Sequence, residues 1–447
     1  MHDEPIHAAT AVFGWSPLWV ATLLFVVTYI VIMSDKLNRA IVALMGAGLL
    51  IFSGILSQDE AMRAVDFNTL GLLLGMMLIV NITRRCGLFQ FVAIWSAKKV
   101  RASPWGILLM MSIVTAVFSA FLDNVTTVLL TVPVTLLITD ALKVKPYPYL
   151  FAQIFASNIG GTATLIGDPP NIMIGSAANL TFNDFGLALT PVIVVVMVAT
   201  MIPLYFIWGR HLSATDENRR HVMDFNERET ITDPRLLKQS LTVIALVIAG
   251  FMMQREIKIE PATIAVFGAA LLLLLDNFGK DPETQSRNVH GALSEAEWIT
   301  LMFFLGLFVL VYGVVKTGLI AQLAHSLIVA THGDFRVTAI AILWASAILS
   351  AFIDNIPFVA TMIPLIKSMS PTFGGEAALL PLWWALSLGA CLGGNGTLIG
   401  ASANLVVAGL SERAGTSFRF MEYLKVAFPL MLISIVISHV YLYWRYL

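Results

Sequence analysis

The sequence predicts an all-α, polytopic membrane protein made of two inverted repeats, and three observations support this fold class. The chain has 447 residues, of which 58% are hydrophobic and only 12% are charged, whereas a soluble domain carries about 25% charged residues. Its apolar runs are long enough to cross a bilayer. Two polar motifs within these runs each occur twice, with the copies 231 to 233 positions apart.

Both halves of the chain contain several long apolar runs, and a spanning helix needs roughly 20 apolar residues. In the first half these runs lie at 17–33, 39–56, 68–84, 105–140, 148–178 and 187–208. In the second half they lie at 238–254, 261–275, 298–315, 338–369, 379–410 and 427–444. A polar segment without a periodic apolar face separates the halves. The expected organisation is therefore a first repeat at 17–210, a cytoplasmic linker at 211–237 and a second repeat at 238–447.

The runs at 105–140 and 338–369 are too long for one straight span, and they hold the first duplicated motif. Residues 119–134 read SAFLDNVTTVLLTVPV, and residues 350–365 read SAFIDNIPFVATMIPL. An Asp-Asn pair lies within each copy. We expect each run to form a re-entrant hairpin, which enters and leaves the membrane on the same side, with the Asp-Asn pair at its tip.

The second duplicated motif follows each hairpin. Residues 160–171 read GGTATLIGDPPN, and residues 393–404 read GGNGTLIGASAN. These stretches are expected to break the spans that contain them at mid-depth, because non-helical backbone at this depth is tolerated only inside protein or beside a water-filled cavity. Each repeat is thus expected to contain about five transmembrane helices, a re-entrant hairpin and a broken helix.

The distribution of Lys and Arg predicts the orientation of the chain. With the N-terminus outside, most basic residues of the loops and the linker lie in the cytoplasm, as the positive-inside rule requires. An odd number of crossings per repeat gives the two copies opposite orientations, which is a transporter architecture. The first residues, MHDEPIH, lack the basic region of a cleaved signal peptide. The first apolar run is therefore expected to remain as a membrane helix.

Asp123 and Asp354 are the carboxylates of the two expected hairpin tips. A carboxylate in an apolar run is costly and usually lies on a transport pathway, so its duplication favours a role in proton coupling or cation coordination. The alternative is a structural role, in which each Asp caps a half-helix. Asp168 has no acidic counterpart, because Ala401 occupies the matching position. The following Pro-Pro sequence leaves a helix cap and a ligand role equally open.

Small and polar residues around the two motifs are the expected substrate-binding and ion-binding residues. Glycine lets the backbone open, so that its amides and carbonyls face a cavity, although a packing seam of small residues is the alternative. The recurrence of Asn171 at Asn404 favours binding. The complete expected set is Asp123, Asn124, Thr126, Asn158, Gly160, Gly161, Thr162, Thr164, Asp168, Asn171, Asp354, Asn355, Gly393, Gly394, Asn395, Thr397 and Asn404.

Several classes of function find no support in the sequence. The net charge of −1 argues against a nucleic-acid partner, and two cysteines, Cys86 and Cys391, form no disulfide framework and no thiolate metal site. No nucleotide-binding loop is present, and the Gly-x-Gly-Asp signature of an intramembrane aspartyl protease is absent. We therefore expect a protein that is not an enzyme and binds no cofactor or metal. Because neither motif contains Lys or Arg, we also expect a neutral, weakly charged or cationic substrate.

At these motifs the chain resembles the ion transporter superfamily, in the branch of the ArsB arsenite permeases, the NhaD sodium/proton antiporters and the melanosomal P protein. SNIGGTATLIGDPPN, DNIPFVATMIP and GACLGGNGTLIGASAN are most similar to the P-protein side. Dicarboxylate carriers of this superfamily have Ser-Asn-Thr at each tip, whereas this chain has Asp-Asn-Val and Asp-Asn-Ile. The departure favours proton or cation coupling over transport of a carboxylate.

The resemblance implies a secondary transporter of the cell inner membrane that uses a proton or sodium gradient. The leading expectation is proton-coupled efflux of arsenite or antimonite. Sodium/proton exchange and an anion transporter or channel remain as alternatives. The expected partners are the lipid bilayer and a small inorganic substrate, and association with a second copy of the chain or with a soluble ATPase subunit stays open.

Overall fold

The structure, a computed structural model, is a helical bundle for which residues 14–34 and 36–447 are described. Within this part of the chain every regular element is helical, and nine helices are long and apolar enough to cross a membrane. The predicted all-α membrane fold is therefore confirmed. The expectation about a signal peptide concerns residues 1–13, which lie outside the described residues.

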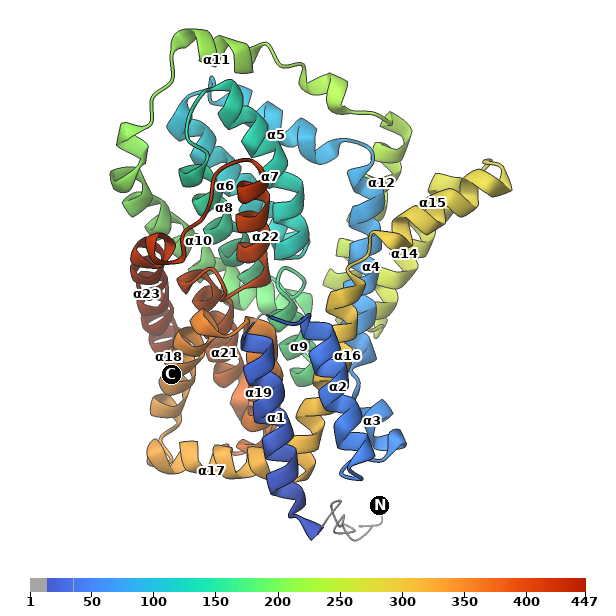
Figure 1. The fold of residues 1–447 in the computed structure, drawn as a ribbon, viewed down its shortest axis with the longest axis vertical. Helices are drawn as coiled ribbons and strands as arrows, with labels where there is room; N and C mark the ends of the chain where they lie inside the picture. Colours follow the sequence, from blue (N-terminus) through green and yellow to red (C-terminus); the bar gives the residue numbers. More distant parts are fainter. Residues whose placement is uncertain (1–13, 35) are drawn as a thin grey trace.

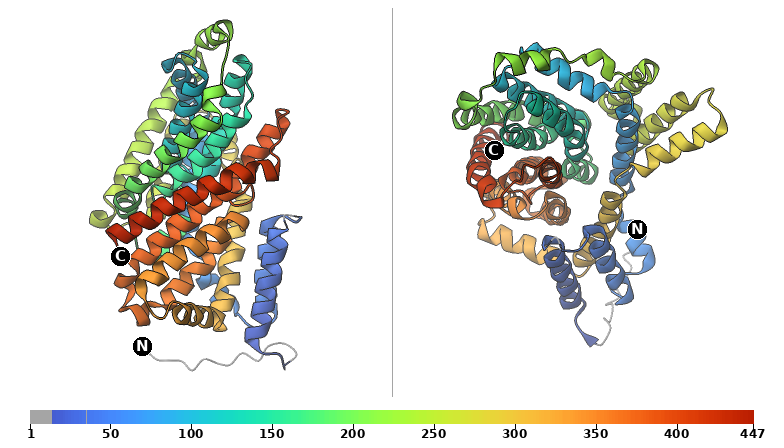
Figure 2. Two further views of the ribbon diagram at one scale, coloured as in Figure 1. Left: turned by 90° about the vertical axis from the view of Figure 1, so that its left-hand side faces the viewer. Right: turned by 45° about the horizontal axis from the view of Figure 1, so that its top comes forward.

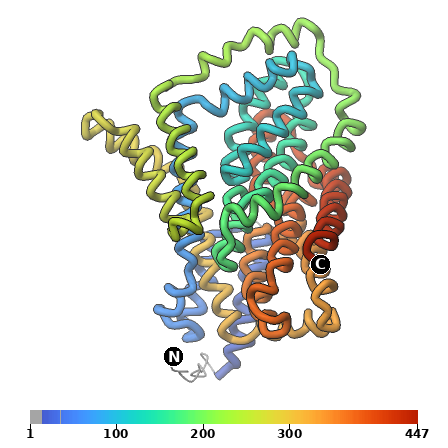
Figure 3. Tube along the Cα trace, turned by 180° about the vertical axis from the view of Figure 1, so that it is seen from behind, coloured from blue at the N-terminus to red at the C-terminus, as the bar shows by residue number. Residues whose placement is uncertain are grey.

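The first half of the chain forms the upper part of the molecule in Figure 1, except for its first helices, which lie below. The helices of this half are α1 (Pro17–Met33), α2 (Arg39–Phe52), α3 (Gln58–Ala64), α4 (Phe67–Arg84), α5 (Leu88–Lys99), α6 (Pro104–Phe121), α7 (Asn124–Ala141), α8 (Tyr147–Thr162), α9 (Pro169–Ala178) and α10 (Phe182–Ile207). The linker contains η2 (Gly209–His211), α11 (Asp216–Met223) and η3 (Glu227–Thr230). It runs over the top end of the bundle, as Figure 3 shows.

The second half has matching elements, and most of them fill the lower part of the molecule (Figure 2, left). They are α12 (Pro234–Met252), α13 (Gln254–Ile257), α14 (Pro261–Asn277), α15 (Pro282–Ser294), α16 (Trp298–Lys316), α17 (Leu319–Ala330), α18 (Phe335–Phe352), α19 (Asn355–Ser368), α20 (Ser370–Phe373), η4 (Glu376–Leu379), α21 (Leu380–Gly393), η5 (Gly394–Gly396), α22 (Ser402–Arg413) and α23 (Phe420–Arg445).

Both expected hairpins are present, and they approach the middle of the molecule from opposite ends. Helices α6 and α7 descend from the end that carries α5 and the linker, whereas α18 and α19 rise from the end that carries α17 (Figure 1). Each hairpin turns at two non-helical residues, Leu122–Asp123 in the first and Ile353–Asp354 in the second. The Asp of each pair is the N-cap residue of the returning helix. The tips therefore meet at mid-height.

The broken helices are held open by side chains of the second motif. The backbone leaves the α-helix after Thr162 in the first half and after Gly393 in the second. The side-chain amide of Asn171 donates to the Thr162 and Thr164 carbonyls at 3.1 and 2.9 Å. In the second half, Asn404 donates in the same way to the carbonyls of Gly394 and Thr397, at 2.7 and 2.9 Å. Each Asn thus replaces helical hydrogen bonds that the break removes.

Glycines allow close contacts between helices of the two halves. Helix α4 packs on α14, and a Cβ atom on Gly75 would lie 2.6 Å from the carbonyl carbon of Ala265. Helix α16 packs on α2, and a Cβ atom on Gly306 would lie 2.6 Å from the carbonyl carbon of Ala43. Gly75 and Gly306 are 231 positions apart. The same contact is thus made twice, each time between one helix of each half.

Candidate functional site

The two hairpin tips enclose a small polar cavity at the centre of the molecule. Its volume of about 10 Å³ is roughly what one water molecule needs when volume is measured for water centres. The lining comes from both tips, from α9 and α22, and from α2, α4 and α16. The lining residues are Arg39, Leu73, Met77, Asp123, Asn124, Val125, Asp168, Pro169, Glu297, Thr300, Asn355, Ile356 and Ser402.

At the first tip, Asp123 is stabilised by its own hairpin. It is 8% exposed, and its carboxylate accepts hydrogen bonds from the backbone N–H of Thr126 at 2.8 Å and from the Thr126 hydroxyl at 2.5 Å. Among the described residues, no Lys or Arg nitrogen lies within ion-pair distance of this carboxylate. Asp123 therefore caps α7, as the structural alternative predicts, and it also lines the cavity.

At the second tip, Asp354 depends on other parts of the chain. Its carboxylate accepts a hydrogen bond from the backbone N–H of Ile356 at 3.2 Å. Pro357 stands where the first tip has Thr126, so neither an N–H nor a hydroxyl is available there. The carboxylate instead binds Arg39 at 2.8 Å and the Ser402 hydroxyl at 2.9 Å.

Arg39, at the first position of α2, is a functional candidate that the motifs did not reveal. Its guanidinium donates to Asp354 and to the Ser402 hydroxyl through one nitrogen, and to the Thr300 hydroxyl through the other at 3.2 Å. Its Cζ atom lies 5.2 Å from the ring centroid of Phe303. Although neither motif contains a cation, packing brings this one to the second tip from 315 positions away.

Asp168 faces the second tip. It occupies the N-cap position of α9, but its side chain makes no capping hydrogen bond, because Pro169 and Pro170 lack N–H groups and the N–H of Asn171 donates to the Asp168 carbonyl. The side-chain amide of Asn355 lies 3.4 Å from both carboxylate oxygens, and Asp168 is 1% exposed. Of the two roles left open for Asp168, this geometry favours that of a ligand.

A chain of buried amides connects the two halves beside this cavity. Asn124 donates to the side-chain oxygen of Asn158 at 3.1 Å. Asn158 in turn donates to the side-chain oxygens of Asn395 at 3.0 Å and Asn404 at 2.9 Å. The amide nitrogen of Asn395 is buried and has no partner among the described residues. An unpaired buried donor is costly, so this group is available to a ligand.

The remaining predicted residues hold the broken helices in place. Thr162 donates to the Asn158 carbonyl at 2.7 Å, whereas the Thr164 and Thr397 hydroxyls donate to the carbonyls of the neighbouring hairpins. The glycines fit close backbone contacts: a Cβ atom would lie within 3.0 Å of a backbone atom at each of them, namely Gly160, Gly161, Gly393 and Gly394. These contacts agree with the alternative that the small residues form a packing seam. A ligand role for these residues remains a prediction.

Sequence reasoning missed Glu297, Thr300, Ser387 and Ser402 in addition to Arg39. Glu297 was detectable, because it follows Asp66 by 231 positions and precedes Thr300 just as Asp66 precedes Thr69. Thr300 donates to Glu297 at 3.2 Å. Ser387 donates to the side-chain oxygen of Asn171 at 2.6 Å. The serines carried no recognisable signal, since single Ser residues are common in apolar helices.

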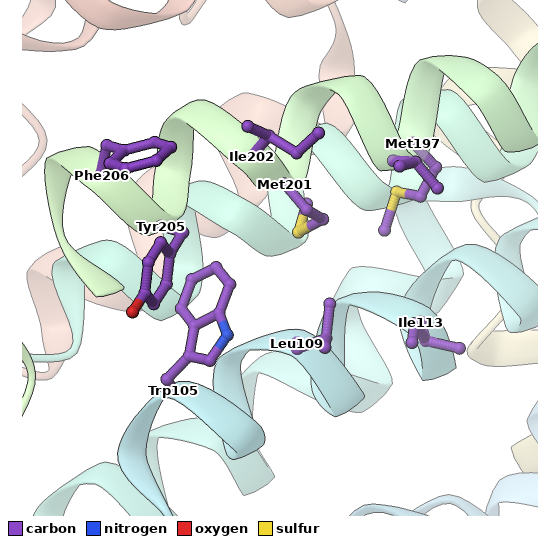
Figure 4. Close-up of a pocket in the computed structure, with 9 residues that line it drawn as sticks. Trp105, Leu109, Ile113, Met197, Met201, Ile202, Tyr205 and Phe206 are labelled. Carbon is purple, nitrogen blue, oxygen red and sulfur yellow. The ribbon is translucent and has the colours of Figure 1, made fainter. Parts of the chain in front are cut away.

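A much larger groove elsewhere is not a site for a polar solute. It has a volume of about 460 Å³ and lies between α6 and α10 (Figure 4). No charged residue lines it, so it offers an ion no compensation for lost hydration. Its walls are formed by Trp105, Leu109, Ile113, Met197, Val198, Met201, Ile202, Tyr205 and Phe206.

Known proteins resemble this chain along nearly its whole length. The profile of the CitMHS family, described as citrate transporter, matches residues 29–389. An uncharacterized transporter of Mycobacterium bovis is 42% identical over 431 residues, which cover 96% of this chain and 98% of the relative. The P protein of Homo sapiens is 32% identical over 506 residues, covering 95% of this chain but only 59% of the P protein.

Two solved transporter structures share the fold at low sequence identity. The YdaH transporter of Alcanivorax borkumensis superposes with a TM-score of 0.59 at 13% identity, covering 96% of this chain and 99% of that one. MtrF of Neisseria gonorrhoeae, described as illuminating a class of antimetabolite efflux pumps, superposes with a TM-score of 0.54 at 11% identity. The coverage is 97% of this chain and 95% of MtrF. At these identities the similarity concerns the fold alone.

Proposed function

Since the chain belongs to the citrate transporter family and is a multi-pass membrane transporter, we propose that it is a secondary active transporter that exchanges protons for a small neutral or cationic solute. The observation that carries this proposal is the meeting of two hairpin tips, each with a carboxylate, at an enclosed polar cavity. Asp123 and Asp354 are the proposed proton-coupling residues. Asp168 and the amides that border the cavity complete the proposed site.

The charge of the site supports protons and neutral or cationic solutes over a polyanion. Four carboxylates, those of Asp123, Asp168, Glu297 and Asp354, lie around one cation, Arg39, which already pairs with Asp354. A citrate ion would add further negative charge where like charges already repel. A proton or a monovalent cation would reduce the excess charge instead.

Arsenous and antimonous acids are the first candidate substrates. Arsenous acid is uncharged at pH 7, so its hydroxyls need hydrogen-bonding partners rather than a fixed cation. Several such bonds, each worth about 0.5–1.5 kcal/mol, suit weak and reversible binding. The unpaired Asn395 amide provides a donor next to the tips. The proposed hydrogen-bonding residues are Asn124, Thr126, Thr162, Asn355, Asn395 and Thr397.

The repeats and the orientation are part of this proposal. Residues 17–210 and 238–447 form two repeats of opposite orientation, joined by a cytoplasmic linker at 211–237. The N-terminus lies outside the inner membrane. The opposed hairpins and the duplicated glycine contacts between the halves support this arrangement. Sodium/proton exchange is the second candidate function, because carboxylates and amide oxygens also suit a sodium ion.

Transport in everted membrane vesicles tests the proposal. Arsenite, antimonite, sodium, lithium and citrate are compared under an imposed pH gradient, for the wild type and for Asp123→Asn. We expect gradient-driven movement of arsenite or antimonite, and at least a tenfold lower rate in the variant, because the neutral amide cannot exchange a proton. Asp140→Asn is the matched control, since Asp140 lies on the same helix with its side chain 80% exposed.

Each alternative outcome has a defined meaning. Movement of sodium or lithium alone identifies a cation/proton exchanger. Citrate transport overturns the charge argument, and arsenite transport that ignores the pH gradient overturns proton coupling. If Asp123→Asn transports at the wild-type rate, the only role of the Asp123 carboxylate is to cap α7.

A further inference from the structure

The ion pair between Arg39 and Asp354 connects helix α2 to the tip of the second hairpin. Arg39 begins α2, which packs on α1 and α16. Asp354 lies at the tip of the α18–α19 hairpin, which packs mainly on α21 and also contacts α16 through α19. The Tyr29 hydroxyl of α1 makes a second connection, donating to the Pro357 carbonyl of α19 at 2.7 Å. Helices α1 and α2 therefore hold the second tip from the same side.

Within residues 14–34 and 36–447, the first tip has no comparable connection. The two glycine contacts place Ala265 of α14 in correspondence with Ala43 of α2, and Arg39 then corresponds to Pro261. A proline at this position provides no charge for Asp123, which Thr126 stabilises instead. The repeat thus duplicates the two carboxylates but provides a cation for only one of them, so their roles differ.

The Arg39–Asp354 pair also lies between two cavities. On one side is the central cavity with Asp123 and Asp168, and Arg39 forms part of its wall. On the other side is a second cavity of about 70 Å³, to which Arg39 and Asp354 contribute the charged groups. Its remaining walls are apolar and comprise Ile32, Met33, Phe352, Ile353, Ile399 and Leu405. The Arg39 and Asp354 side chains are 25% and 18% exposed.

We propose that Arg39 is the gating residue of this transporter, and that its ion pair with Asp354 closes the path from the second cavity to the central one. The central cavity has space for only about one water, so a solute enters only after the wall that contains Arg39 has moved. While the pair is closed, Arg39 occupies the place of a cation at Asp354. The pair opens when another cation, a proton or a metal ion, takes that place.

Other ionisable groups face this pair. They come from α1, α7, α9 and α16, and they are Tyr29, Asp123, Asp168 and Glu297. All of them are neutral or negative, so none can take over the role of Arg39 as the cation. Removal of the Arg39 charge should therefore open the path without a substitute from within the protein.

Cysteine accessibility tests this gate without any substrate, so its failure is distinct from a failure of the proposed function. Met77 lines the central cavity and is 4% exposed, and Met77→Cys serves as the reporter. The reagent is 2-hydroxyethyl methanethiosulfonate, which is uncharged, so a change in site charge does not attract it. Its rate of addition to the full-length protein in membranes is followed by mass spectrometry. Cys86 and Cys391 are fully buried, and the parent chain gives the background.

We expect Arg39→Gln and Asp354→Asn each to raise the labelling rate of the reporter at least tenfold. Arg39→Lys keeps the charge and should stay within about threefold of the wild-type rate. The matched control is Arg85→Gln, which removes another ion pair, that with Asp276 at 3.0 Å, away from the tips. The double variant Arg39→Gln/Asp354→Asn leaves no unpaired charge at this pair, so it gives the answer if a single variant fails to fold.

The proposal is overturned if Arg39→Gln and the double variant label at the wild-type rate. It is also overturned if Arg85→Gln accelerates labelling as much as Arg39→Gln, because the effect would then be a general loosening of the bundle. Faster labelling in Arg39→Gln and in the double variant, with unchanged rates in Arg39→Lys and Arg85→Gln, assigns gating to the Arg39 charge.

Discussion

Asn171 and Asn404 show how a single side chain makes a broken membrane helix tolerable. Exposed backbone carbonyls in a membrane protein cost several kcal/mol when nothing satisfies them. Each Asn provides its amide to two of these carbonyls, and both residues are fully buried. The side-chain oxygen remains free for the opposite half, where Ser387 donates to Asn171 and Asn158 donates to Asn404. The duplicated Asn residues therefore join the repeats as well as closing the breaks.

We predict that Asn171→Ala lowers the free energy of unfolding by about 2–4 kcal/mol. The substitution leaves the Thr162 and Thr164 carbonyls and the Ser387 hydroxyl without their partner, and an unsatisfied buried group costs about 1–3 kcal/mol. Unfolding in mixed micelles measures the change. The control is Gln322→Ala at an exposed position of α17, where the effect should stay within about 0.5 kcal/mol. Equal losses in the two variants would refute the structural role of Asn171.

At the scale of elements, the linker is fastened to the end of α4 and to α5. Lys98 of α5 binds Glu227 of the linker at 2.6 Å and the Phe225 carbonyl at 3.0 Å. The hydrogen bond from Lys98 holds the pKa of Glu227 below its ordinary value. Between α4 and α5, Gly87 adopts a left-handed conformation with φ +82°, and a Cβ atom there would lie 1.7 Å from the Thr230 carbonyl oxygen. The turn and the linker therefore fit together only with glycine at this position.

Gly87→Ala should detach the linker from the bundle. The matched control is built into the repeat, because Gly318 lies 231 positions later at the same turn, with φ +89° and nothing within 4 Å of an added Cβ. In both variants, placing alanine in the left-handed conformation costs about 1–2 kcal/mol, but only in Gly87→Ala does the new Cβ atom collide with Thr230. Limited proteolysis of vesicles with the linker exposed should cut residues 225–233 at least tenfold faster in Gly87→Ala. Equal cutting rates in the two variants would contradict this account of Gly87.

At the scale of the whole molecule, hydrophobicity and duplication were enough to predict the long apolar helices, both hairpin turns and both helix breaks, whereas the shorter helices α5 and α17 lie outside the predicted runs. Those features are local, because a run of apolar residues or a Gly-Gly pair indicates the structure of the segment that contains it. The cation of the site was not predictable in this way. Arg39 begins an ordinary apolar run and reaches Asp354 only because α2 packs on α16, and a contact between such distant segments leaves no trace in either motif. The same holds for Ser387, whose partner Asn171 lies in the other half.

The orientation of the molecule yields a prediction that rests on the length of one helix. Helix α10 has 26 residues and is therefore about 39 Å long, enough to cross a hydrocarbon core of about 30 Å. Asn179 and the linker lie at opposite ends of it and must face opposite sides of the membrane. Both Asn179 and Glu217 are exposed.

We expect an impermeant maleimide to label Asn179→Cys only from the periplasm, in intact cells, and Glu217→Cys only from the cytoplasm, in everted vesicles. Labelling of both cysteines from one side would exclude a crossing by α10, and the reverse pattern would place the N-terminus inside.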